Sequence, residues 1–219
     1  MSKDTDLAKL LGTGIVAVLR ADDGRLLVDA TEALLAGGVD TVEVTFTVPK
    51  APRVLEQVAD RMGDRVLLGA GTVLDAETAR IAILSGAKFV VSPVVALSVV
   101  QLCRRYSILA LPGALTPSEV LAAWEAGADI VKVFPSELTG PGYLKALAGP
   151  LPQVRLMPTG GVNLETAAAF LRAGACALGI GGSLVDPKAL AAGDMRRIES
   201  LARQYVQIVR ETRAAMSGS

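Results

Sequence analysis

Short runs of aliphatic residues alternate along the chain with longer stretches that have helical periodicity. Such runs are typical of parallel strands buried on both faces, and the amphipathic stretches between them are typical of helices that cover those strands. Strands are predicted at 14–20, 40–47, 66–71, 88–92, 108–112, 129–134, 154–158 and 176–181. Eight strands, each followed by a helix, predict an α/β fold in which residues 1–219 form a single (β/α)8 TIM barrel. A doubly wound open sheet is the alternative, because the number of strands does not prove closure.

A repeated glycine context supports the barrel. The four segments are Ala36-Gly37-Gly38-Val39, Ser85-Gly86-Ala87, Ala126-Gly127-Ala128 and Ala173-Gly174-Ala175, each just before a predicted strand. A glycine there fits the left-handed residue that ends many helices. The recurrence indicates one βα unit used several times. A long charged helix at 195–214 is expected to close the structure, and the tail 215–219 is expected to be disordered.

Composition and charge restrict the classes of partner and the cellular location that are expected for the chain. Lys and Arg number 22, and so do Asp and Glu, so no basic excess is available for a nucleic acid backbone and no nucleic acid partner is expected. No apolar run approaches the ~18 residues of a membrane-spanning helix, and the start MSKDTDLAKLLG lacks the apolar core of a signal peptide. The chain is therefore expected to be a soluble cytoplasmic protein with two free thiols, Cys103 and Cys176.

The sequence contains no histidine. This excludes Ser-His and Cys-His nucleophile systems and the usual imidazole metal ligands. Acid–base chemistry must then use a carboxylate, lysine, tyrosine, hydroxyl or water. Neither a metal nor another cofactor is expected.

Polar residues on two predicted strands are candidates for catalysis. Val42 and Val44 alternate with Glu43, so the apolar side chains meet the helices and Glu43 points inward. By the same period, Lys132 points inward between Val131 and Val133. Buried opposite charges are costly and are seldom placed for stability alone. Burial also favours the neutral amine that attacks a carbonyl. Lys132 is the candidate nucleophile and Glu43 the candidate proton shuttle; a buried salt bridge, or a lysine reaching to the rim, is the structural alternative.

Small and polar residues gather at the predicted carboxyl ends of the strands, where barrel enzymes carry their active sites. Thr159-Gly160-Gly161 and the segment ending in Gly182-Ser183 follow the last two strands, where backbone N–H groups often hold phosphate. Arg20 could bind a carboxylate with two hydrogen bonds, and Thr72 could add a hydroxyl. The alternative for the two glycine segments is that they form ordinary tight turns. For Arg20 the alternative is a surface arginine, and for Thr72 it is a strand-end cap.

These residues resemble the KDPG/KHG aldolase family, the aldolases of 2-keto-3-deoxy-6-phosphogluconate and 4-hydroxy-2-oxoglutarate. The resemblance covers nearly the whole chain. Its segments are IVAVLR at 15–20, VEVTFTVP at 42–49, GAGTV at 69–73, VSP at 91–93, LPG at 111–113, VKVFP at 131–135, PTGGV at 158–162 and GIGGSLV at 179–185. The VKVFP and PTGGV segments are the most distinctive.

The resemblance implies that Lys132 forms a Schiff base with the substrate and that Glu43 moves the protons. It also implies that Pro93 and Phe134 shape the pyruvyl pocket and that Thr72 contacts the substrate carboxylate. The implied phosphate site is formed by Thr159, Gly160, Gly161, Gly182 and Ser183. Several relatives carry an arginine at the position of Thr47, so here Arg20 and Thr72 must hold the carboxylate. A homotrimer is implied as well.

The expected activity is that of a class I aldolase, a lyase that cleaves 2-keto-3-deoxy-6-phosphogluconate reversibly to pyruvate and glyceraldehyde 3-phosphate. This would place the protein in carbohydrate metabolism of the Entner–Doudoroff type. One alternative is cleavage of 4-hydroxy-2-oxoglutarate to pyruvate and glyoxylate. Another is a phosphate-binding barrel isomerase or synthase in which Lys132 is only an electrostatic group.

Overall fold

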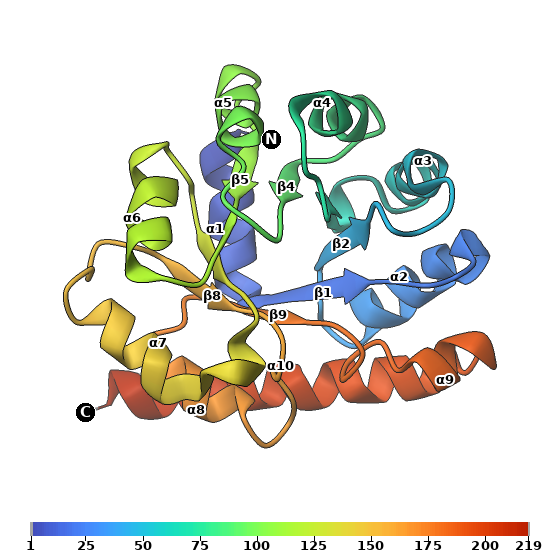
Figure 1. The fold of residues 1–219 in the computed structure, drawn as a ribbon. Coiled ribbons are helices and arrows are strands. Elements are labelled where there is room, and N and C mark those ends of the chain that lie inside the picture. Colours follow the sequence, from blue (N-terminus) through green and yellow to red (C-terminus); the bar gives the residue numbers. More distant parts are fainter. Residues whose placement is uncertain (1, 219) are drawn as a thin grey trace.

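The computed structural model describes residues 2–218 as an α/β fold of parallel strands surrounded by helices (Figure 1). Every one of the eight predicted runs contains a strand. The strands are β1 Ile15–Leu19, β2 Thr41–Thr45, β3 Leu67–Gly71, β4 Phe89–Val91, β5 Leu109–Leu111, β6 Gly113–Ala114, β7 Val131–Val133, β8 Leu156–Pro158 and β9 Leu178–Ile180.

The strands form two parallel sheets whose edges approach each other. One sheet has the order β5-β4-β3-β2-β1-β9 and the other the order β6-β7-β8. The fifth predicted strand, 108–112, contains β5 and ends at Pro112, which has no N–H to donate to a ladder; β6 follows directly and belongs to the other sheet. The Pro112 carbonyl still accepts a bond from the Lys132 amide at 2.9 Å. At the other edge, isolated bridges pair Leu156 with Ala175 and Thr159 with Gly179.

Except for the first helix, which precedes β1, the helices follow the strands and cover their outer faces (Figure 1). They are α1 Lys3–Thr13, α2 Leu27–Ala36, α3 Ala51–Met62, α4 Ala76–Leu84, α5 Leu97–Arg105, α6 Pro117–Glu125, α7 Gly140–Ala148, α8 Ala167–Arg172, α9 Pro187–Ala191 and α10 Met195–Ser217. Three short 3-10 helices are η1 Gly24–Leu26, η2 Gly63–Arg65 and η3 Ser136–Leu138. The long α10 packs against α2 and α8. No helix within residues 2–218 has the length and apolarity needed to cross a membrane.

The tail differs from its prediction. Residues 215–217, expected to be disordered, continue α10, and the Ser217 hydroxyl donates to the Arg213 carbonyl at 3.0 Å. Ser219 lies outside the described residues.

The four glycine positions end helices as predicted. Gly38, Gly86, Gly127 and Gly174 have φ values of 92°, 103°, 100° and 101°. At each, the next residue's amide donates back to a carbonyl five residues earlier, as from Val39 to Leu34 at 2.9 Å. This is the Schellman arrangement, and it turns the chain from a helix directly into the following strand.

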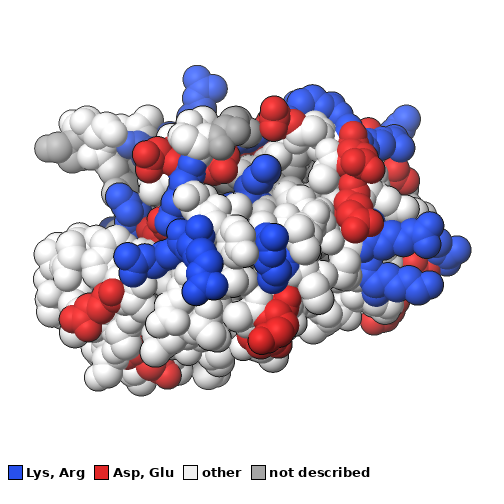
Figure 2. Space-filling view, turned by 90° about the horizontal axis from the view of Figure 1, so that it is seen from above, with Lys and Arg blue, Asp and Glu red and all other residues white. Residues whose placement is uncertain are grey.

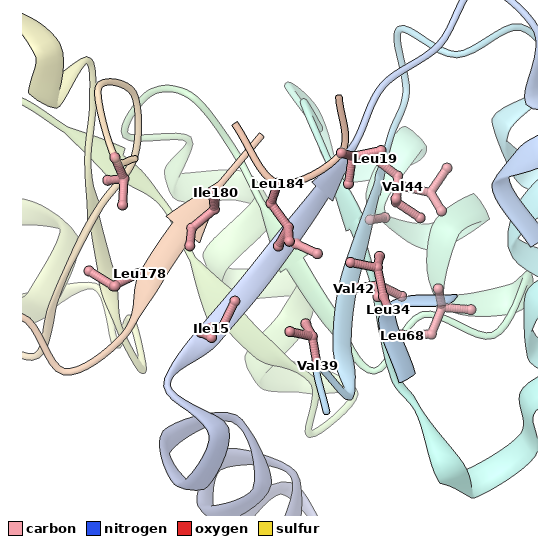
Figure 3. Close-up of a cluster of buried hydrophobic side chains, with 14 of the residues drawn as sticks. Ile15, Leu19, Leu34, Val39, Val42, Val44, Leu68, Leu178, Ile180 and Leu184 are labelled. Carbon is pink, nitrogen blue, oxygen red and sulfur yellow. The ribbon is translucent and has the colours of Figure 1, made fainter. Parts of the chain in front are cut away.

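The period-two alternation of the strands divides the core into two clusters. Outward side chains such as Val42, Val44 and Ile180 pack against the helices (Figure 3). Inward side chains form a separate inner cluster that is fully buried. Its members are Leu10, Val16, Leu67, Phe89, Val91, Leu109, Leu111, Ile130, Met157 and Ala177. Leu10 comes from α1, a helix that the sequence analysis did not predict.

Candidate active site

A cavity of about 1080 Å³ opens at the carboxyl ends of the strands. All eleven residues predicted for the site line this cavity. They are Arg20, Glu43, Thr72, Pro93, Lys132, Phe134, Thr159, Gly160, Gly161, Gly182 and Ser183. The sequence therefore identified residues from seven separate strand ends that the fold brings together.

Glu43 lies deep in the cavity in the middle of β2, and only 1% of its surface is exposed. Neither carboxylate oxygen has a hydrogen-bond partner among residues 2–218. Gly71 on the neighbouring β3 leaves the space for this side chain, because a Cβ there would overlap Glu43 Oε1. Burial raises the pKa of Glu43, and the positive charges of Lys132 and Arg20 oppose that rise in part. A buried carboxyl group without partners is costly, so Glu43 does not contribute to stability through a hydrogen bond at this position.

Lys132 is the central residue of β7 and is 6% exposed. Its Nζ lies 5.1 Å from the centre of the Phe134 ring, which forms one wall of the cavity. In the described part of the chain no carboxylate oxygen lies within 4.0 Å of Nζ, so the salt bridge considered above is not formed. Lys132 and Glu43 therefore face one cavity and interact through their charges, while both functional groups stay available to a ligand.

Thr72 shows that the backbone is constrained at the site. It follows β3 and has a φ of 56°, in the left-handed region. A β-branched residue in this region is a genuine outlier, and its conformation costs of order 1–3 kcal/mol. Such strain is concentrated at functional sites, where the surrounding structure holds it in place. Thr47 is exposed and outside the cavity lining, and its hydroxyl forms a hydrogen bond with that of Thr45 at 2.8 Å.

The two glycine segments, at 160–161 and 181–182, also line the cavity. Gly160 and Gly161 have φ values of 87° and 71°, and a Cβ at Gly161 would lie 2.8 Å from Glu137 Cα. Only glycine is compatible with both the positive φ and the short distance to Glu137 at position 161. The backbone at 160–161 therefore lines the cavity without side chains that would cover its amides. The buried Thr159 hydroxyl has no hydrogen-bond partner within residues 2–218. This part of the lining presents donors that a ligand can use.

The outer part of the cavity contains residues that were not predicted from the sequence. The lining there includes Asp22, Asp23, Arg25, Glu137, Pro187 and Leu190. The Arg25 guanidinium bonds to Asp23, whose carboxylate also caps η1 through the Arg25 amide at 2.9 Å. These residues belong to loops and short helices after strands, where no periodic pattern indicates which side chains face a cavity. The Asp23-Gly24 pair was the one local signal, since it marks a turn.

The charged side chains visible in Figure 2 do not form a large patch of one sign. Basic and acidic side chains are interspersed over this face. No group of three or more potential metal ligands of the Cys, Asp and Glu type gathers within residues 2–218.

Comparison with known proteins identifies the family. The family model for KDPG and KHG aldolases matches residues 7–201. A 2-dehydro-3-deoxy-phosphogluconate aldolase of Treponema pallidum is 39% identical over 197 residues, which cover 89% of this chain and 91% of that protein. A KHG/KDPG aldolase of Escherichia coli is 35% identical over 206 residues, which cover 93% and 96%.

A solved structure agrees with these sequence relatives. It is that of a KDPG aldolase from Legionella pneumophila with pyruvate captured at low pH as a covalent carbinolamine intermediate. It superposes with a TM-score of 0.84 at 28% identity, over 90% of this chain and 96% of that chain. From its sequence, its fold and these relatives, this chain belongs to the KDPG and KHG aldolase family.

Proposed function

We propose that this protein is a class I aldolase that cleaves 2-keto-3-deoxy-6-phosphogluconate (KDPG) reversibly to pyruvate and glyceraldehyde 3-phosphate. One observation carries the proposal: a lysine and a carboxylate, both buried and neither in an ion pair within residues 2–218, line the same cavity. The relatives named as KDPG aldolases, one of them holding a pyruvate carbinolamine, support both the substrate and the Schiff-base chemistry. The reaction would serve carbohydrate metabolism of the Entner–Doudoroff type in the cytoplasm.

Lys132 begins the reaction. Its neutral amine adds to the C2 ketone to give a carbinolamine, which loses water to form an iminium. The iminium then accepts the electron pair of the C3–C4 bond as that bond breaks. The products of this step are an enamine on Lys132 and the free aldehyde. Because the iminium acts as the electron sink, the step requires no Lewis acid.

Glu43 moves the protons. As the C3–C4 bond breaks, its carboxylate takes the proton of the C4 hydroxyl, and it then delivers that proton to C3 of the enamine. Water hydrolyses the resulting iminium and releases pyruvate. A carboxyl pKa raised by burial lies closer to neutral pH, which suits a group that must both accept and donate a proton.

The remaining lining residues bind the two ends of the substrate. Arg20 and Thr72 hold the carboxylate, with Pro93 and Phe134 enclosing the pyruvyl part. The phosphate lies against Thr159, Gly160, Gly161, Gly182 and Ser183. It accepts from the two hydroxyls and from the amides of the last four residues, because the Thr159 amide already donates to the Val133 carbonyl.

A substitution at Ser183 tests the phosphate site. In the wild type, kcat/KM for KDPG should exceed that for 4-hydroxy-2-oxoglutarate by about 10²-fold, since the loss of two charge-assisted hydrogen bonds costs about this much. Ser183→Asp should remove most of this preference by placing a carboxylate against the phosphate, while cleavage of the smaller acid continues. The neutral Ser183→Asn variant, of similar size, is the control. Equal wild-type efficiency on both substrates would remove the phosphate site from the mechanism.

Cleavage of 4-hydroxy-2-oxoglutarate is the second candidate activity. The Escherichia coli relative named KHG/KDPG aldolase supports it, and so does the proposed chemistry, in which Lys132 and Glu43 act without the phosphate. An isomerase or synthase would not form a covalent bond to Lys132. Treatment with pyruvate and borohydride, followed by mass spectrometry of the Lys132 peptide, therefore distinguishes an aldolase from that class.

The strands are proposed to close into a single (β/α)8 barrel. In such a barrel β5 and β6 are one strand interrupted at Pro112, and β8 and β9 are neighbours. The bridge between Thr159 and Gly179 and the bond from the Lys132 amide to the Pro112 carbonyl support closure at these two edges. Closure brings β2 and β7 to opposite walls of one interior, as the proposed pair of Glu43 and Lys132 requires.

A homotrimer is the proposed assembly. Large apolar side chains are exposed on α4, on α5 and on the loops before them, and these two helices are in contact. They are Leu74, Ile81, Leu84, Val94 and Leu97, with Leu84 69% exposed. Exposed apolar groups of this kind mark protein interfaces.

Sedimentation checks this assembly. Leu84→Glu is expected to shift the protein toward monomers, because a charge would be buried in the interface. Met216→Glu, at an exposed apolar position on α10, is the control and should sediment like the wild type. A monomeric wild type would contradict the proposal.

A further inference from the structure

Ser183 belongs to a short loop that is fixed on its protein-facing side. The loop follows β9, and the amides of Leu184 and Val185 both donate to the Gly181 carbonyl at 2.9 Å. Leu184 and Val185 are buried and join the helix-facing core, where Leu184 lies beside Ile180 (Figure 3). Ser183 itself is exposed and lines the cavity. The loop therefore presents Ser183 to the cavity from an anchored base.

Tyr205 reaches this loop from a distant helix. It lies near the middle of α10, its side chain is fully buried, and its hydroxyl donates to the Ser183 carbonyl at 3.4 Å. Burial raises the pKa of Tyr205 to about 12, so the hydroxyl remains a donor at all physiological pH values. In the described chain this is the one side-chain hydrogen bond that joins 181–183 to another element.

The bond completes the fixation of one peptide group. The planar unit between Ser183 and Leu184 donates through the Leu184 amide to Gly181 and accepts through the Ser183 carbonyl from Tyr205. Held at both ends, this peptide restricts the ψ angle of Ser183. That restriction limits the directions in which the Ser183 Cβ and amide can point.

Stability alone gives little reason for this hydroxyl. Tyr205 belongs to the helix-facing apolar core, and a phenylalanine ring would fill the same space as its ring. Burial of a hydroxyl group is costly, and one hydrogen bond as long as 3.4 Å offsets only part of that cost. The group is better explained by what it positions.

We propose that Tyr205 is a positioning residue for the phosphate end of the substrate, acting through Ser183. The inference rests on the proposed phosphate site. Tyr205 touches no substrate, so its removal should affect binding of the phosphate rather than the chemistry at Lys132. The substrate 4-hydroxy-2-oxoglutarate has no phosphate and serves as an internal reference.

The experiment compares Tyr205→Phe with the wild type on both substrates. For KDPG, kcat/KM should fall by about 2- to 10-fold, the value of one neutral hydrogen bond, mainly through a higher KM. For 4-hydroxy-2-oxoglutarate it should stay within the error of the wild type. Inhibition by inorganic phosphate should weaken by the same factor as KDPG binding.

Tyr143→Phe is the matched control. The Tyr143 hydroxyl also donates to a backbone carbonyl, that of Leu115 at 2.5 Å, but Tyr143 does not line the cavity. This variant should lower the melting temperature without changing the ratio of the two substrate efficiencies. If Tyr205→Phe lowers kcat/KM equally for both substrates, or lowers it for neither, the positioning role is wrong.

The outcomes also separate this inference from the proposed function. If the wild type forms no pyruvate from either substrate, the aldolase proposal fails. The Tyr205 inference is then decided by the rise in melting temperature that inorganic phosphate produces. A smaller rise in Tyr205→Phe than in the wild type supports the inference, and an equal rise contradicts it.

Discussion

Replacement of Lys132 by alanine is expected to abolish pyruvate formation, with a loss of about 10⁵-fold or more, the scale seen when a covalent nucleophile is removed. No other lysine lines the cavity within residues 2–218, so no second amine can take over. Pyruvate and borohydride should no longer add mass to the protein. Retention of that adduct in the variant would show that the nucleophile is a different lysine.

Lys132→Ala should still fold. Lys132 forms no ion pair in the described chain, so its removal breaks no bridge. It also removes a positive charge that lowers the pKa of Glu43, so the pKa of this carboxyl group should rise further in the variant. Lys88→Ala is the control, since Lys88 is exposed at the start of β4 and should keep full activity. Circular dichroism of all three proteins separates lost chemistry from lost structure.

Replacement of Glu43 by glutamine should slow cleavage by about 10²–10⁴-fold, the usual contribution of a positioned general acid–base group. The amide preserves shape but cannot accept the C4 hydroxyl proton. The Schiff base should still form, so borohydride should trap pyruvate in this variant although turnover is slow. A wild-type rate in Glu43→Gln would show that another group or water moves the protons.

The same substitution should stabilise the protein at neutral pH. Because the folded-state pKa of Glu43 lies above that of the unfolded chain, the native state binds more protons between these two values. The wild type therefore loses stability as pH rises from the ordinary carboxyl range, near about 4.3, through the raised pKa. Glu43→Gln removes this loss. Its melting temperature should exceed that of the wild type at pH 7 and approach it at pH 4.

The candidate site was predictable because strand periodicity is local. Val42 and Val44 fix the inward direction of Glu43 without knowledge of any other strand, and Val131 and Val133 do the same for Lys132. The rule that parallel strands end at one rim then brought these two residues into one cavity. The left-handed glycines were predictable for a similar reason, since a helix end depends on a few consecutive residues.

Features that depend on distant contacts were not predictable from the pattern. Helix α1 has the signals of a helix start, with Ser2 accepting a bond from the Thr5 amide, but nothing local indicates that Leu10 enters the inner cluster. The left-handed conformation of Thr72 contradicts its own propensity and exists because the surrounding structure imposes it. The Tyr205 bond to Ser183 joins positions 22 residues apart and has no sequence signature.

In the proposed mechanism the covalent bond to Lys132 determines the order in which products leave. The inner cluster fills part of the interior with buried apolar side chains, and the cavity lies at the carboxyl ends of the strands. The aldehyde is free once the C3–C4 bond breaks and departs first, whereas pyruvate stays attached to Lys132 until hydrolysis. In the synthetic direction pyruvate loads first, and each incoming aldehyde meets an enamine already in place. The range of aldehydes accepted for carbon–carbon bond synthesis is then set by the outer lining, which includes Arg25, Glu137 and Pro187. Substitutions intended to change which aldehydes are accepted can therefore begin at these residues and leave Lys132 and Glu43 unaltered.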